Sequence, residues 1–362
     1  MRPERDGEGA ENMGVEKNGM RMIRTEDAVG TVLCHDITQI IPGKVKDAVF
    51  RKGHIVREED IPILLSVGKE NLYVWEEMEG MLHENKAADI LCQVCKGNYM
   101  TSSEAKEGKI ELTAQKEGLL KVDTEKLNRV NGMGQIVIAS RHGNFPVRAG
   151  DKIAGMRVVP LVIEKEKMDR VKEVCGEEPV FRILPFQAMK VGIVTTGSEV
   201  YAGRIKDQFT PVVAEKLKEY HLEVLGHVLC SDDTDMEEQA IRQWMKEGAD
   251  LVICTGGMSV DPDDRTPLAI RNTTDEVVTY GAPVLPGAMF MLAYKYREDG
   301  SLLPVLGLPG CVMYAKRTIF DLALPRIAAG EKLTEKDFTQ MGEGGLCLSC
   351  TTCTFPDCGF GK

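Results

Sequence analysis

The chain has 362 residues, of which 43% are hydrophobic and 6% aromatic, a composition typical of a globular protein with two or three domains. Its formal net charge of −11 argues against nucleic-acid binding, which depends on clustered lysines and arginines. No apolar run approaches the roughly 18 residues that span a bilayer and the polar start is unlike a signal peptide, so we expect a cytoplasmic protein that binds no membrane.

The first half of the chain shows a disordered tail followed by a mixed α+β region. Residues 1–19 contain almost no apolar side chains, which predicts disorder. Residues 20–180 alternate short strand and helix patterns with Gly and Pro breaks. Near the end of this region, Met168, Val171 and Val174 repeat at helical spacing, which predicts a helical connector before a boundary near 180.

From Lys190 onward, short apolar strands alternate with helical patterns, the signature of a parallel sheet built from βαβ units. We therefore expect residues 181–333 to form a three-layer α/β domain with a mostly parallel sheet. The expected strands are 191–195, 222–228, 250–254 and 302–306, with an edge strand at 275–280. The expected helices begin at Thr210, at Thr234 in a capping box with Glu237, and after Gly310, the last carrying Val312, Ala315, Ile319 and Leu322 inward.

Four polar or glycine-rich segments follow strands of this sheet: 195–199 (TTGSE), 231–233 (SDD), 255–267 (TGGMSVDPDDRTP) and 308–310 (LPG). Ligands of open α/β sheets bind outside the carboxyl ends of the strands. Glycines allow a ligand to approach backbone amides, which suits a phosphorylated ligand. The carboxylates of Glu199, Asp232 and Asp264 have the hard oxygen chemistry that Mg²⁺ prefers. The glycines concerned are Gly197, Gly256, Gly257 and Gly310.

Each of these segments alone also has an ordinary structural interpretation. Thr-Gly-Gly is a common turn after a strand, and Asp232, Glu199 or Asp264 could be a solvated residue at a turn or at the start of a helix. Four such segments within one sheet favour a binding site.

The order of the four segments, over residues 190–328, resembles the molybdopterin-binding domain shared by molybdenum cofactor adenylyltransferases and molybdopterin molybdenumtransferases. The resemblance implies binding of molybdopterin or adenylated molybdopterin, and insertion of molybdate with Mg²⁺-assisted release of AMP. It implies that Asp232 and Asp264 hold Mg²⁺ and that Glu199 orients water or metal. The residues expected to bind the pterin and its phosphate are Thr196, Gly197, Ser198, Thr255, Gly256, Gly257, Ser259, Pro309 and Gly310.

The first half is similar to the transferase branch, because residues 26–33 (EDAVGTVL) and Asp36-Ile37 match the opening of those enzymes. The transferases' Met-Asp-Gly-Tyr-Ala segment does not occur in the sequence. Where their Lys-Pro-Gly-Lys-Pro is expected, residues 285–289 read Leu-Pro-Gly-Ala-Met, and Cys311 follows Pro309-Gly310 in place of the usual asparagine.

These departures leave two alternatives to the transferase open. One is a molybdopterin carrier or sensor that serves a molybdenum hydroxylase, and the other is an adenylyltransferase that makes the adenylate from ATP. The resemblance also implies a homodimer.

The last segment, residues 334–362, is rich in cysteine. Cys347, Cys350, Cys353 and Cys358 follow the spacing C-x2-C-x2-C-x4-C, and thiolates at such short gaps can converge on one ion or cluster. We expect a metal-binding tail that holds Zn²⁺ or an iron–sulfur cluster, since the spacing is close to a ferredoxin-type run but differs in the last gap. The alternative is a reduced, flexible tail that contacts a partner.

Overall fold

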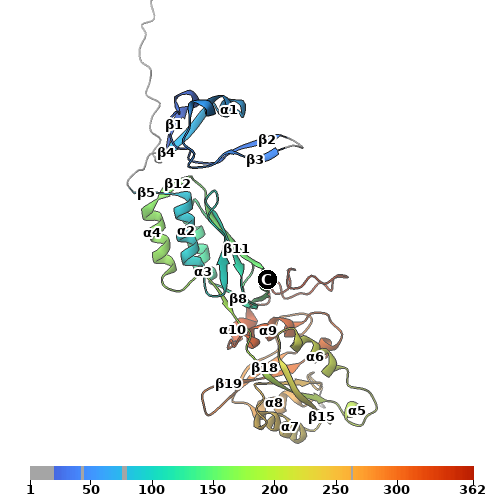
Figure 1. Cartoon of the computed structure of the whole chain (residues 1–362). Helices are drawn as coiled ribbons and strands as arrows, with labels where there is room; N and C mark the ends of the chain where they lie inside the picture. Colours follow the sequence, from blue (N-terminus) through green and yellow to red (C-terminus); the bar gives the residue numbers. More distant parts are fainter. Residues whose placement is uncertain (1–19, 42–44, 76–79, 262–263) are drawn as a thin grey trace, which may run out of the picture. The chain divides into compact units, whose positions relative to one another are not determined.

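The computed structural model describes residues 20–41, 45–75, 80–261 and 264–362 (Figure 1). The expected disordered tail at 1–19 lies outside these ranges. The chain divides into two compact units, which we describe separately. Unit 1 comprises residues up to 113 together with 123–141 and 152–181, and unit 2 comprises 114–122, 142–151 and 182–362.

Unit 1 contains a four-stranded sheet in the order β6-β7-β11-β9. Helix α2 (Glu84–Cys95) packs against β11 (Lys152–Val158) and against α4 (Lys165–Cys175). The expected connector helix is therefore α4, and its buried Met168 and Val171 make it part of a packed unit and not a linker. The other strands of this sheet are β6 (Met100–Ser102), β7 (Lys109–Ala114) and β9 (Ile136–Ser140).

The rest of unit 1 consists of short elements. A small cluster of buried residues that includes Leu33, Ile37 and Leu64 holds its first segment together. These elements are β1 (Met20–Arg24), η1 (Thr25–Asp27), β2 (Ile37–Ile41), β3 (Val45–Phe50), η2 (Glu58–Asp60), α1 (Ile61–Ser66), β4 (Asn71–Trp75), β5 (Met81–His83), α3 (Thr124–Asn131) and β12 (Val162–Glu164).

The boundary near 180 agrees with the division at 181/182, but the first half is not one continuous unit. Strands β8 (Gly118–Val122) and β10 (Phe145–Val147) form a three-stranded sheet with β13 (Phe181–Leu184), and both belong to unit 2. The expected region 20–180 thus contributes two segments to the other unit.

Unit 2 is built on a six-stranded sheet in the order β15-β14-β16-β19-β18-β17. The first four strands are parallel neighbours, and β18 and β17 are antiparallel. This confirms the expected mostly parallel sheet. The strands are β14 (Lys190–Thr196), β15 (Glu223–Cys230), β16 (Leu251–Thr255), β17 (Glu276–Tyr280), β18 (Met291–Tyr296) and β19 (Leu302–Leu308), of which β18 was not expected from the sequence.

Helices cover both faces of this sheet, which makes the three expected layers (Figure 1). Val191 and Ile193 of β14 point into one core with residues of α6 (Phe209–Lys218) and α9 (Ile319–Ala328). Val194 points into the other core, with residues of α7 (Thr234–Lys246) and α8 (Thr266–Thr273). Alternation of side chains along buried strands explains why the strands read as continuous apolar runs.

A glycine-lined niche fixes α7 on the sheet. The indole of Trp244 is buried and donates a hydrogen bond to the carbonyl of Ile193 at 3.1 Å. A Cβ atom at Gly192 would lie 2.3 Å from Trp244 Cγ, and one at Gly226 would lie 2.9 Å from Trp244 Cη2. The two glycines therefore make room for the indole against the strands.

Two helix expectations were wrong in detail. Asp233, and not Thr234, caps α7, because its side chain accepts a hydrogen bond from the Met236 amide, and Glu237 lies buried instead of closing a capping box. The helix expected after Gly310 is interrupted. A 3₁₀ turn, η3 (Gly310–Met313), comes first, and α9 begins only at Ile319, after the N-cap Thr318.

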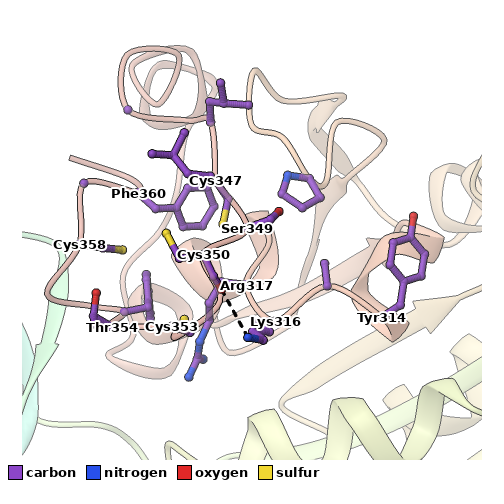
Figure 2. A pocket seen from close by; sticks show the side chains of 17 residues that line it. Tyr314, Lys316, Arg317, Cys347, Ser349, Cys350, Cys353, Thr354, Cys358 and Phe360 are labelled. Atoms are coloured by element: carbon purple, nitrogen blue, oxygen red, sulfur yellow. Dashed lines mark hydrogen bonds between the residues drawn. The ribbon is translucent and has the colours of Figure 1, made fainter.

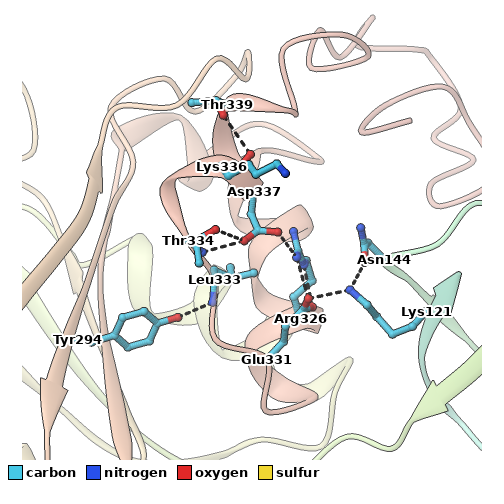
Figure 3. A network of polar contacts seen from close by, with 10 residues as sticks. All are labelled: Lys121, Asn144, Tyr294, Arg326, Glu331, Leu333, Thr334, Lys336, Asp337 and Thr339. Atoms are coloured by element: carbon cyan, nitrogen blue, oxygen red, sulfur yellow. Dashed lines mark hydrogen bonds and ion pairs between the residues drawn. The ribbon is translucent and has the colours of Figure 1, made fainter. Parts of the chain in front are cut away.

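The C-terminal segment is part of unit 2. Leu333 and Phe338, the latter in α10 (Glu335–Thr339), and Phe360 are buried in the main core. Arg326, which is buried in α9, pairs with Glu331 at 2.8 Å and with Asp337 at 2.6 Å (Figure 3). This network ties α10 to α9, so the segment is packed and not an independent tail.

Candidate functional site

The four segments expected to form a site lie at one edge of the sheet. Strand register pairs Thr196 with Cys230, Thr195 with Thr255, and Thr255 with Leu308, so β14, β15, β16 and β19 all end at this edge. The loops that follow these strands carry the predicted residues. The sheet therefore brings together four segments that are far apart in the sequence.

The glycine loop after β16 has a conformation that requires its glycines. Gly256 has φ +87° and Gly257 has φ +52°. A Cβ atom at Gly256 would lie 2.3 Å from the Thr196 carbonyl oxygen, and one at Gly257 would lie 2.8 Å from the Thr266 hydroxyl. The loop thus passes directly against the end of β14.

Two side chains hold the following residues in place. Met258 is buried, and a Cβ atom at Gly307 would lie 2.4 Å from its terminal methyl group, so Met258 fills the space above β19. Tyr280, on the edge strand β17, donates a hydrogen bond to the Met258 carbonyl at 3.1 Å. Partial burial, together with the charge of Asp264, raises the Tyr280 pKa, which keeps the phenol protonated as a donor.

Asp264 stabilises the turn that follows the glycine loop. Its Oδ2 accepts a hydrogen bond from the Ser259 amide at 2.8 Å, and its own amide donates to the Asp261 carbonyl at 2.9 Å. Residues 262 and 263 lie outside the described part of the chain. The carboxylate therefore shapes the turn and retains one oxygen, Oδ1, for which the described contacts include no hydrogen bond.

Asp232 organises the turn after β14. Its Oδ2 accepts hydrogen bonds from both the amide and the hydroxyl of Ser198, at 2.9 and 2.8 Å. Gly197, at φ +138°, allows the chain to turn here, and Glu199 follows with an exposed side chain. These hydrogen bonds join the segment 195–199 to the segment 231–233.

Asp232 and Glu199 share an open, polar hollow of about 700 Å³. It carries four carboxylates and one guanidinium, that of Arg265. Negative potential from the carboxylates disfavours a bare phosphate and favours a divalent cation or a cation-bound phosphate. The lining residues are Ser198, Glu199, Asp232, Asp233, Thr234, Asp235 and Arg265.

Not all predicted site residues face this hollow. Asp264 does not line it, although its neighbour Arg265 does. Thr255 is fully buried and its hydroxyl donates to that of Thr195 at 3.2 Å, while Pro309 is buried at the start of η3. Gly310 is exposed, and its backbone is not at positive φ.

Thr196 is also buried, and its hydroxyl lies 3.1 Å from that of Thr266. In the described parts of the chain, no three His, Cys, Asp or Glu side chains are close enough to hold a single metal ion. Asp232, Asp264 and Glu199 therefore do not form a preassembled ion cage in these residues.

Glu237 is a buried carboxyl group close to the site that the sequence did not reveal. It is 1% exposed, and neither oxygen has a partner at hydrogen-bonding distance in the described residues. Burial raises its pKa to about 7, the Thr266 hydroxyl close by opposes this rise, and Asp232 and Asp233 add to it. A glutamate four residues after an Asp-Asp pair reads as a helix-start residue, so only the fold reveals its burial.

One family model matches the part of the chain that carries these loops. The family model described as "Probable molybdopterin binding domain" matches residues 192–329. Residues 192–329 form a molybdopterin-binding domain of this family. This confirms the resemblance drawn from the four motifs. A second model, a domain of unknown function (DUF8806), matches residues 22–76, which include the 26–33 stretch.

The chain also has shorter likenesses to curated proteins. A CinA-like protein of Mycolicibacterium vanbaalenii is 42% identical over 78 residues, which is 21% of this chain and 18% of that protein. A CinA-like protein of Mycobacterium sp. (strain MCS) is 36% identical over 77 residues, with the same two shares of 21% and 18%. The chain thus matches less than a fifth of the length of these relatives.

Solved structures similar to the chain include two proteins of cofactor synthesis. The molybdopterin biosynthesis enzyme MoaB of Thermus thermophilus is 25% identical, covers 40% of this chain and 98% of its own, and has a TM-score of 0.34. The tungsten cofactor synthesizing protein MoaB of Pyrococcus furiosus is 20% identical, with coverage of 39% and 92% and a TM-score of 0.33. Among the helices that the structure describes, none has both the length and the apolar character needed to cross a membrane.

Proposed function

We propose that the protein acts in molybdenum cofactor biosynthesis, where it binds adenylated molybdopterin, releases AMP and inserts molybdate with the help of Mg²⁺. The observation that carries this proposal is the convergence of four motif loops at one sheet edge within the molybdopterin-binding domain at 192–329. The glycine loop offers backbone amides to a phosphate, and the neighbouring hollow offers carboxylates to a cation.

The residues of the acidic hollow fit Mg²⁺. This ion is commonly held by one or two carboxylates together with substrate phosphate oxygens, so three converging protein ligands are not required. Asp232 and Glu199 line the hollow, and Asp264 directly precedes Arg265, which also lines it. When bound, the ion would neutralise phosphate charge. Asp232 would hold the Ser198 turn, and Asp264 the Ser259 turn, in the form that receives the ligand.

The direct test incubates the purified protein with adenylated molybdopterin, Mg²⁺ and molybdate and measures AMP. We expect AMP release that depends on Mg²⁺ and falls by about 100-fold or more in Asp264→Ala, since loss of a metal-holding or loop-forming carboxylate removes electrostatic stabilisation. Asp250→Ala at the opposite end of the sheet is the matched control, and its rate should equal that of the wild type. No AMP release by the wild-type protein would refute the enzymatic proposal.

A non-catalytic carrier or sensor is the second candidate, and one observation favours it. The segment at 285–287, where the transferases carry lysines, is bonded to the cysteine segment: the Leu285 amide donates to the Gly345 carbonyl at 2.8 Å, and the Cys347 amide donates to the Leu285 carbonyl at 2.8 Å. Residues 285–287 thus hold the cysteine segment in place through backbone hydrogen bonds, where the transferases carry lysines. Tight pterin binding without AMP release would favour a carrier, with a molybdenum hydroxylase as the recipient.

Other parts of the proposal are tested separately. Pyrophosphate release from ATP and molybdopterin would instead indicate an adenylyltransferase. The proposed homodimer predicts that sedimentation equilibrium gives twice the mass of one chain, which is 40.0 kDa. The cytoplasmic location and the transferase-like nature of residues 20–180 also remain proposals.

A further inference from the structure

The four cysteines of the C-terminal segment surround one cavity. This cavity has a volume of about 500 Å³, and Cys347, Cys350, Cys353 and Cys358 all line it. Figure 2 shows them on the C-terminal segment, with Lys316 and Arg317 beside Cys350 and Cys353. Of its lining, only Pro286 and residues 314–317 lie within the family match at 192–329, and the cavity shares no residue with the acidic hollow.

The size of this cysteine cavity favours a cluster over a single ion. Four thiolates that bind a single Zn²⁺ contact it at about 2.3 Å and leave no space between them. Here the four thiols line one cavity together with other residues, and the volume of the whole cavity is about 500 Å³. That space is many times the roughly 30 Å³ that a water molecule occupies in the liquid. An iron–sulfur cluster held by four cysteines is a ligand of several atoms and suits it.

The fourth cysteine is the decisive one. In ferredoxin-type runs the last cysteine of the motif ligates a second cluster when two are present. In this chain Cys358 lines the same cavity as the other three, and both Cys347 and Cys358 are packed against the main core of unit 2. Residues 347–358 thus bring all four thiols to one cavity.

Cationic groups at the cavity wall complement the negative charge of thiolates. Lys316 Nζ donates hydrogen bonds to the carbonyls of Thr351 at 2.8 Å and Cys350 at 3.4 Å, which fixes the loop that bears the exposed cysteines. Arg317 lies over the Phe355 ring, 4.9 Å from its centroid. Burial alone would lower the Arg317 pKa, but hydrogen bonds to Glu219 and Asp321 raise it, so the guanidinium stays charged.

Buried residues hold the segment with Lys316 and Arg317 in position. Lys216 and Asp321 are both buried and pair at 2.6 Å, and Lys216 Nζ also donates to the Lys316 carbonyl at 3.0 Å. Apolar side chains, including those of Leu346, Phe355 and Phe360, line the rest of the cavity. Low polarity around thiolate-bound iron limits access of water to it.

We infer that Cys347, Cys350, Cys353 and Cys358 bind one [4Fe–4S] cluster in this cavity. The site belongs to the same unit as the molybdopterin-binding domain and is joined to it through the short segment between Gly310 and Lys316. The inference does not depend on the proposed function, since it rests on the cysteine cavity alone.

The test uses the full-length protein, purified without oxygen and incubated with ferrous iron and sulfide. We expect about four irons and four acid-labile sulfides per chain, with the broad visible absorption of a thiolate-ligated cluster. The double variant Cys350→Ser/Cys353→Ser should lose at least about 90% of both, because two ligands are missing. Cys350 and Cys353 are exposed, so this variant should fold, which circular dichroism verifies.

Cys311→Ser is the matched control, since this half-buried cysteine does not line the cavity, and it should keep the full iron and sulfide content. If the double variant fails to fold, each single variant, Cys350→Ser and Cys353→Ser, is measured in its place and should lose cluster absorption. One zinc per chain without sulfide would overturn the inference, as would iron and sulfide contents that are the same in the variants and the wild type.

Discussion

At the scale of single residues, the least expected group is the carboxyl of Glu237, which is buried without a hydrogen-bond partner in the described chain. Its pKa is about 7 in the folded protein, against 4.5 for an ordinary glutamate. The folded state therefore retains a proton between these two pH values that the unfolded chain releases.

The Glu237 pKa leads to a prediction about stability. Its contribution is fully present below pH 4.5 and is lost as the pH rises through about 7, so the free energy of unfolding should fall across this interval by about 3 kcal/mol. Glu237→Gln should remove this part of the slope, since the amide stays neutral. Urea unfolding at several pH values without divalent cations measures it. Glu247→Gln, at the exposed end of α7, should leave the slope unchanged; equal slopes in all three proteins would contradict the prediction.

The glycine loop allows a second test at this scale. Gly256→Ala places a Cβ atom 2.3 Å from a backbone oxygen in a backbone conformation with φ +87°, so it should both destabilise unit 2 and displace the loop. We expect a loss of at least about 2 kcal/mol and a pterin affinity at least about tenfold lower. Gly203→Ala is the matched control, because φ is +68° there but no atom lies within 4 Å. Calorimetry with molybdopterin would refute the prediction if both variants bound equally.

At the scale of elements, the sequence predicted the parallel strands well, because each is an uninterrupted apolar run that ends in a polar or glycine-rich turn. It did not predict β18, since Gly281, Pro283, Pro286 and Gly287 come in close succession before it and mask its start. The helix after Gly310 was predicted as continuous from apolar spacing alone. The break at 314–318 arises from long-range contacts of Lys316 and Arg317, which no local pattern encodes.

The position of the candidate site was predicted from the sequence, but the burial of its residues was not. The four loops follow from strand order, but the burial of Thr255 and of Glu237 depends on how helices cover the sheet. Asp233 competes successfully with Thr234 for the cap of α7 because its carboxylate reaches the Met236 amide. A sequence pattern that permits both caps cannot decide between them.

The pairing of α9 with α10 gives a prediction at the element scale. Arg326→Met leaves the carboxylates of Glu331 and Asp337 without their buried partner, and we expect a loss of about 3 kcal/mol. Lys218→Met removes an exposed pair with Glu215 and should cost less than about 1 kcal/mol. Urea unfolding of both variants measures the difference, and similar costs would show that the Arg326 network does not hold the C-terminal segment.

At the scale of the whole molecule, the sequence predicted a boundary near 180, and the contact pattern assigns segments 114–122 and 142–151 to unit 2. Short strands such as β8 and β10 carry no signal for which unit they join. β8 pairs with β13 at 181–184, and a pairing over this sequence distance is set by the tertiary fold and not by a local pattern.

The C-terminal segment should also connect metal binding to the stability of unit 2. Phe360 and Phe338 are in its main core, so a cluster bound between residues 347 and 358 stabilises the fold that holds it. We expect the cluster-loaded protein to unfold at a temperature at least about 5 °C higher than the cluster-free protein. In Cys350→Ser/Cys353→Ser, the same incubation with iron and sulfide should produce no shift. A shift of equal size in this variant would show that the stabilisation arises elsewhere.

The burial of Trp244 between Gly192 and Gly226 makes its intrinsic fluorescence a probe of unit 2. The chain has two tryptophans, and replacing Trp75 in unit 1 by phenylalanine leaves the indole of Trp244 as the single emitter. Its burial against Gly192 and its hydrogen bond to Ile193 predict blue-shifted fluorescence in the folded state. Since Ile193 lies three residues before Thr196, at the end of the same strand, this emission would report ligand arrival and unfolding of unit 2 without any attached label.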